Sequence, residues 1–201
     1  MSGAPTVADT RHHLHTVLTD LAGVVDGIDD DHRRVPTPCT QFDVASLLEH
    51  VVGWLDTFSA GYADPGGRAP RADLTDYRAP EDAAAAVRAS AATLDAALAA
   101  GAGARPLALG EASMPGEMAL SMILWEYQVH GWDLAVATGQ PWSPPTEGLE
   151  DSLAFAPMML PADYQGEGKP FAPRVAVADD APALDRLVAL SGRDPGWARP
   201  N

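Results

Sequence analysis

Three residues with metal-binding side chains stand out in the chain, and two of them lie close together. Glu126 and His130 are four residues apart in a stretch of helical character that ends at Gly139. On a helix, this spacing places a carboxylate and an imidazole on one face, a turn apart. His50 lies in a separate helical stretch, at the edge of its apolar face, so it can point inward between helices.

Two imidazoles and one carboxylate form a donor set that suits zinc and other divalent first-row metals. Three protein donors leave one position open for water or a substrate, which is the pattern of catalytic rather than structural zinc sites. The alternative is a hydrogen-bonded pair of Glu126 and His130 with His50 satisfied separately, because matches at this spacing are common. Spacing alone leaves both interpretations open.

Two further polar residues near this set also have alternative interpretations. Asp133 follows His130 by three residues on the same side of the helix. It could hold the imidazole through a hydrogen bond, or lie outside the bundle and interact with arginine or water. Cys39 precedes the helix of His50, and we expect a small buried apolar side chain there rather than a fourth metal ligand.

Several other residues could contribute to a site, but each has a simpler expected role. The histidines near the N-terminus are expected in an exposed, frayed first turn, rather than at a metal: His12, His13 and His15. Arginines of the C-terminal region could bind a substrate carboxylate, but surface pairing with acids is expected: Arg174, Arg186 and Arg193. Three helical residues could line a pocket, but core packing is expected: Met122, Trp125 and Trp132. The substrate-binding residues stay unknown.

Four helical stretches must position the candidate site. Apolar residues at three- and four-residue steps predict helices over residues 7–28, 44–61, 80–101 and 113–139. Asp43 is the expected N-cap of the second helix. These stripes predict an all-α four-helix bundle, and facing helices of such bundles often hold metal sites.

The pattern changes after Pro141. A short helix is expected over residues 149–160, an extended segment over 174–177 and a last short helix over 183–190. We therefore divide the chain into a metal-binding bundle and a C-terminal appendage packed on it. Their predicted limits are residues 1–141 and 142–201.

Composition restricts the partners and the compartment. The formal net charge of −15 argues against nucleic acid and anionic membranes, because either would repel the surface. The single cysteine rules out an intrachain disulfide and agrees with a reducing compartment. No signal core or membrane-length apolar run is evident, so we expect a cytoplasmic protein. The hydrophobic share of 46% is compatible with a monomer or a homodimer.

Two motifs carry a family resemblance. Residues 37–53, TPCTQFDVASLLEHVVG, resemble the pattern TPC-x-x-(aromatic)-x-V-x-x-L-L-x-H-V-V-G. Residues 130–140, HGWDLAVATGQ, are similar to H-x-W-D-L-A-x-A-T-G. Residues 171–177 and 185–195 also resemble one actinobacterial branch. The chain thus resembles the DinB/YfiT-like metalloenzyme family, in the branch related to the metal-binding domain of mycothiol-dependent maleylpyruvate isomerase.

The resemblance implies a four-helix bundle that holds a divalent metal, usually zinc, through His50, Glu126 and His130. It also implies a thiol transferase or isomerase, in which mycothiol attacks a small electrophilic organic substrate. The isomerase has a larger C-terminal domain where this chain has a short tail. Metal-dependent hydrolysis and a non-catalytic metal- or ligand-binding module therefore stay open as alternatives.

Overall fold

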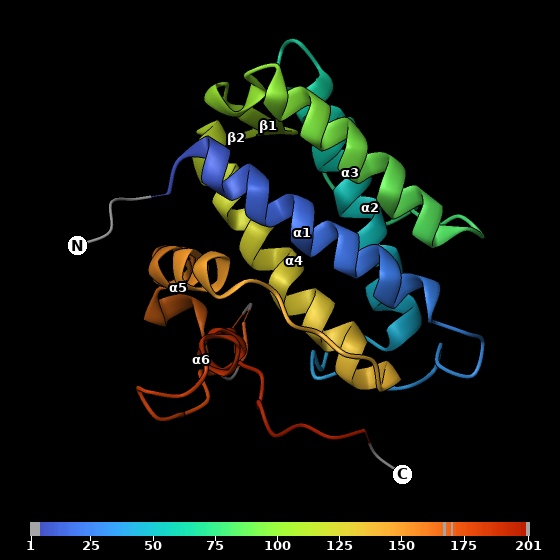
Figure 1. The fold of residues 1–201 in the computed structure, drawn as a ribbon, viewed down its shortest axis with the longest axis vertical. Coiled ribbons are helices and arrows are strands. Elements are labelled where there is room, and N and C mark those ends of the chain that lie inside the picture. The colour runs from blue at the N-terminus through green and yellow to red at the C-terminus, as the bar shows by residue number, and fades with distance from the viewer. Residues whose placement is uncertain (1–4, 167, 170, 200–201) are drawn as a thin grey trace.

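Four long helices form the body of the molecule, as predicted (Figure 1). The computed structural model describes residues 5–166, 168–169 and 171–199. The helices of the bundle are α1 Val7–Asp26, α2 Val44–Ala63, α3 Ala83–Ala99 and α4 Gly116–Thr138. Their apolar faces meet in one large core of buried residues. The all-α prediction is confirmed, and no helix in the described part of the chain is long and apolar enough to cross a membrane.

Both helices at the start of the chain have well-formed N-termini. The side chain of Thr6 accepts a hydrogen bond from the backbone of Asp9, whose carboxylate accepts one from the backbone of Thr6. Asp43 caps α2 in the same reciprocal way with Ser46, which confirms the predicted N-cap. His12 and His15 are exposed as expected, but His13 is buried, and the cap orders the first turn of α1, which was expected to fray.

A small β-hairpin at one end of the bundle was not predicted. Strand β1, Leu107–Leu109, pairs antiparallel with β2, Ala112–Met114. The predicted start of the last bundle helix at residue 113 is therefore wrong, and α4 begins at Gly116. A side chain at Gly116 would collide with backbone, since an added Cβ would lie 2.1 Å from the carbonyl oxygen of Arg105. Strands of three residues are too short for a period of two to be visible in the sequence.

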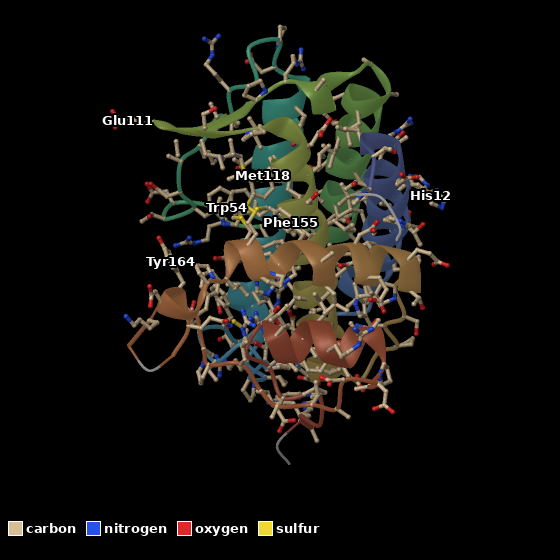
Figure 2. The ribbon with its side chains drawn as sticks, turned by 90° about the vertical axis from the view of Figure 1, so that its left-hand side faces the viewer. His12, Trp54, Glu111, Met118, Phe155 and Tyr164 are labelled. Carbon is tan, nitrogen blue, oxygen red and sulfur yellow. The ribbon has the colours of Figure 1, made fainter. Side chains whose placement is uncertain are left out.

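The C-terminal part covers the outer side of α4. It consists of α5 (Thr146–Met159), the short 3-10 helix η2 (Ala162–Tyr164) and α6 (Ala183–Leu190). In Figure 2, α5 and α6 cross in front of the bundle helices. A second core joins these helices to α4 through the side chains of Trp125, Val129, Leu149, Ala156, Leu160 and Leu187.

Two details of the predicted appendage differ from the structure. The first helix begins three residues earlier than expected, at Thr146. Residues 174–177 belong to no strand, although the backbone N–H of Val175 donates to the carbonyl of Ala189. The outer limits of the two predicted segments, residues 1 and 201, lie outside the described residues.

Helix α4 is fastened to α2 by a buried hydrogen bond. The hydroxyl of Tyr127 donates to the backbone carbonyl of Val51 over 3.1 Å, and the tyrosine side chain has no exposed surface. Since Val51 and Tyr127 each neighbour a residue of the candidate site, this bond helps to set the distance between the two helices that carry it.

The substitution Tyr127→Phe tests this contact. It removes the hydroxyl and leaves the ring, so the free energy of unfolding should fall by about 1 kcal/mol, the usual net value of such a bond. Urea denaturation measures the change. Tyr164→Phe is the matched control, because Tyr164 is 53% exposed, and it should have little effect. Equal effects of the two substitutions would contradict the role of the buried hydroxyl.

Candidate metal centre

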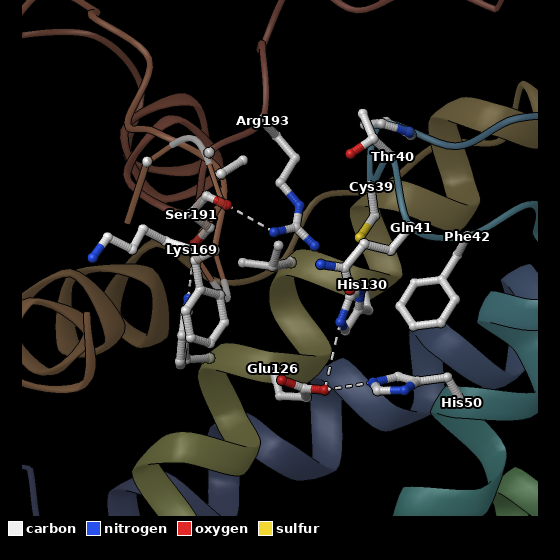
Figure 3. Close-up of a pocket in the computed structure, with 17 residues that line it drawn as sticks. Cys39, Thr40, Gln41, Phe42, His50, Glu126, His130, Lys169, Ser191 and Arg193 are labelled. Atoms are coloured by element: carbon white, nitrogen blue, oxygen red, sulfur yellow. Dashed lines mark hydrogen bonds and ion pairs between the residues drawn. The ribbon is translucent and has the colours of Figure 1, made fainter. Parts of the chain in front are cut away.

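The three predicted donors converge on one point between α2 and α4 (Figure 3). Nε2 of His50 lies 3.0 Å from Oε1 of Glu126, and Nε2 of His130 lies 3.5 Å from the same oxygen. One candidate ligand atom from each residue lies within 4.8 Å of the other two. Two helices that are far apart in the sequence therefore present three donors to one place.

The spacing of these atoms is compatible with a divalent metal. Two ligand atoms that are each about 2 Å from a tetrahedral zinc ion lie roughly 3.3 Å apart. The separations of 3.0 and 3.5 Å fall on either side of that value. The same atoms also interact without an ion, as a carboxylate between two imidazoles. The site thus has the donor chemistry and the size for a divalent cation.

Glu126 is held in its charged form. Burial alone would raise the pKa of this carboxyl group, but the neighbouring imidazoles of His130 and His50 outweigh burial and lower its pKa to about 2. Glu126 is therefore a carboxylate at neutral pH, the form that binds a cation.

Asp133 contacts both His130 and an arginine, which the sequence analysis gave as alternative partners. Its Oδ2 lies 2.9 Å from Nδ1 of His130 and 3.0 Å from Nη2 of Arg193. The carboxylate is fully buried, which would raise its pKa, but Arg193 and the hydrogen bond with His130 lower it instead. Since Nδ1 of His130 faces this carboxylate, Nε2 is the ring nitrogen left to face Glu126.

Arg193 brings the C-terminal segment to the site. Besides contacting Asp133, its guanidinium donates to the backbone carbonyl of Ser191 over 2.7 Å. The hydroxyl of Ser191 in turn accepts a hydrogen bond from the indole of Trp125, on α4. These contacts fasten the chain after α6 to the helix that carries Glu126 and His130.

The three tail arginines behave differently from one another. Arg186 forms the expected surface pair with Glu150. Arg193 does not, because its acidic partner Asp133 is fully buried and its own side chain is nearly so. Arg174 pairs with no acid among the described residues and instead donates to the side chain of Gln165 and to a backbone carbonyl.

A pocket of about 420 Å³ opens beside the donors. Its walls come from the loop 38–42, from α4 and from two segments of the tail, and it includes Trp125 but neither Met122 nor Trp132. The ring of Phe42 lies 4.9 Å from the ring of His50, so an aromatic side chain covers one side of the donor cluster (Figure 3).

Two pocket residues have positions that the sequence analysis did not predict. Cys39 is half-buried and lines the pocket, rather than acting as a buried core residue. Burial raises the pKa of its thiol, and Cys39 is not in the donor cluster. Lys169 also lines the pocket, and it is the only lysine of the chain. The presence of a single lysine was visible in the sequence, but it did not indicate that this residue lines the pocket.

The chain is similar to known proteins over most of its length. The family model described as "Mycothiol maleylpyruvate isomerase N-terminal domain" matches residues 14–135. Two Mycobacterium tuberculosis proteins are each 31% identical over 176 residues, which covers 86% of this chain and 91% of each relative. They are Uncharacterized protein MT0763 of strain CDC 1551 / Oshkosh and Uncharacterized protein Rv0738 of strain H37Rv. No solved structure has a significant match to the chain.

The buried ion pair generates a prediction about stability. Arg193→Met leaves the charge of Asp133 buried without its cationic partner, so the free energy of unfolding should fall by about 3 kcal/mol. Arg186→Met is the control, because its partner Glu150 is half exposed and such pairs contribute about 0–1 kcal/mol. Urea denaturation compares the two. A loss for Arg193→Met no larger than that of the control would contradict this account.

Proposed function

Because the chain belongs to the family of the mycothiol maleylpyruvate isomerase N-terminal domain, we propose that it is a metal-dependent enzyme that uses a small thiol. The metal is zinc, the thiol is mycothiol, and the reaction is transfer to, or isomerisation of, a small electrophilic organic compound. The observation that carries the proposal is the convergence of His50, Glu126 and His130 on the wall of an open pocket.

The proposed ligands are these three side chains. A metal bound there would favour the thiolate form of a thiol, which is the nucleophilic form. Asp133 orients His130 through the contact at Nδ1. Phe42 and Trp125 add apolar surface to the pocket beside the proposed ligands.

The pocket also supports a preference for acidic ligands. Its two basic side chains are Lys169 and Arg193, and its carboxylate Glu126 already lies between two imidazoles. The whole chain carries a net charge of −15, and Arg193 is paired with Asp133, so Lys169 is the cation of the pocket that can attract an anion. A carboxylate on the thiol or on the electrophile would therefore bind towards Lys169, the more exposed of the two.

Metal analysis tests the proposed ligands. Protein purified without chelators should contain about one divalent metal per chain, while His50→Ala should contain at least tenfold less. His15→Ala is the matched control, since His15 is an exposed histidine on α1 and its loss should leave the metal content unchanged. Elemental analysis with circular dichroism separates loss of metal from loss of fold. Wild-type protein without stoichiometric metal would contradict the proposal.

An activity assay tests the reaction class. With metal-loaded protein, the loss of a generic electrophile should require mycothiol; transfer consumes one thiol per electrophile, whereas isomerisation releases the thiol again without net loss. His50→Ala should reduce the rate to the uncatalysed level. Turnover of a substrate in the complete absence of thiol would indicate a metal-dependent hydrolase instead. Tight binding of the thiol without turnover would indicate a non-catalytic binding module.

A further inference from the structure

A second group of polar side chains is buried behind α4, away from the pocket. His13 lies on α1, Gln128 on α4 and Ser152 on α5. Gln128 has no exposed surface, Ser152 is 1% exposed and His13 is 9% exposed. Within the described residues, Nδ1 of His13, both side-chain polar atoms of Gln128 and the hydroxyl of Ser152 have no hydrogen-bond partner. Buried polar atoms without partners are rare, and each would cost stability.

The three helices meet at Gly148, where α5 comes closest to the other two. A Cβ added at Gly148 would lie 2.9 Å from Cγ of His13 and 3.2 Å from Nε2 of Gln128. Cγ of His13 and Nε2 of Gln128 therefore lie no more than about 6 Å apart, so the imidazole and the amide border the same small region beside α5. Ser152 is one helical turn after Gly148, so it lies on the same face of α5.

We infer that this group is a binding site for a buried water molecule, which bridges α1, α4 and α5. Nε2 of His13 points to the carboxylate of Asp151, at 3.5 Å, so Nδ1 is the nitrogen that faces the interior. If Nε2 donates its proton to Asp151, Nδ1 can only accept one. Water both donates and accepts, and it can serve an imidazole nitrogen, an amide and a hydroxyl together.

The water would stabilise the side of α4 that faces away from the donors. Gln128 lies two residues from Glu126 and two from His130. Its backbone carbonyl is already held by the indole N–H of Trp142, at 3.0 Å. With its side chain bridged to α1 and α5, Gln128 would fix the rotation of α4 about its axis, and with it the direction of the donors. This inference does not depend on the proposed metal or reaction.

A crystal structure of the full chain at about 1.5 Å tests the site directly. The expected result is one water within about 3.2 Å of the Gln128 side chain, of His13 Nδ1 and of the Ser152 hydroxyl. A direct hydrogen bond between Gln128 and His13 or Ser152 would overturn the inference. So would a site with no ordered water.

A double-mutant cycle tests the same site in solution. Gln128→Leu and Ser152→Ala should each raise the unfolding equilibrium constant, but the double variant should raise it at least three-fold less than the product of the two effects. A difference smaller than three-fold between the double variant and the product of the single effects would overturn the inference of a shared water. Gln128→Leu with Thr138→Ala is the control pair, because the hydroxyl of Thr138 bonds within α4, to Leu134, and this pair should show no coupling. Circular dichroism verifies that each variant is folded.

Discussion

The site depends on the contacts of the buried Asp133 carboxylate with His130 and Arg193. A buried charge is tolerated only when it is paired and hydrogen-bonded, and Asp133 meets this condition through two partners, Arg193 and His130. One partner belongs to the donor cluster and the other to the C-terminal segment. The same carboxylate thus sets the orientation of the His130 imidazole and holds the C-terminal segment against α4. Neither can be altered without a cost to the other.

Helix α4 has to be buried on nearly all sides, and this explains the appendage. Leu120 and Ile123 face the core of the bundle, while Trp125 and Val129 belong to the second core with α5 and α6. If α4 packed only against α1, α2 and α3, Trp125 and Val129 would be exposed to water as an apolar patch. The appendage covers it, and α4 stays open towards the pocket around Glu126.

The parts of the structure that follow from short-range periodicity were predictable. The bundle, its helices and the shared face of Glu126 and His130 all follow from a repeat of three to four residues. The N-cap Asp43 was also visible in the sequence, because capping depends on its immediate neighbours. His50 was placed near the pair by its position on a second amphipathic helix and by the family resemblance.

The features that were missed depend on long-range contacts or on elements too short to have a period. Arg193 is 60 residues from Asp133 in the sequence, and no spacing rule connects them. His13 looks like a terminal histidine until α5, with Asp151, is folded over it. The hairpin has only three residues in each strand. In each case the local sequence allows more than one structure, and a contact with a distant part of the chain determines which one forms.

The pocket is formed by segments that differ in how tightly packing constrains them. Its donors come from two core helices, where a substitution disturbs packing, whereas part of its outer wall comes from Gly166, Lys169, Phe171 and Ala172, and Lys169 is exposed. The side chain of Lys169 sets the charge of that wall, while the direction of the donors is set by α2 and α4. A change of side chain at Lys169 can therefore alter the pocket surface without disturbing the packing that holds the three donors.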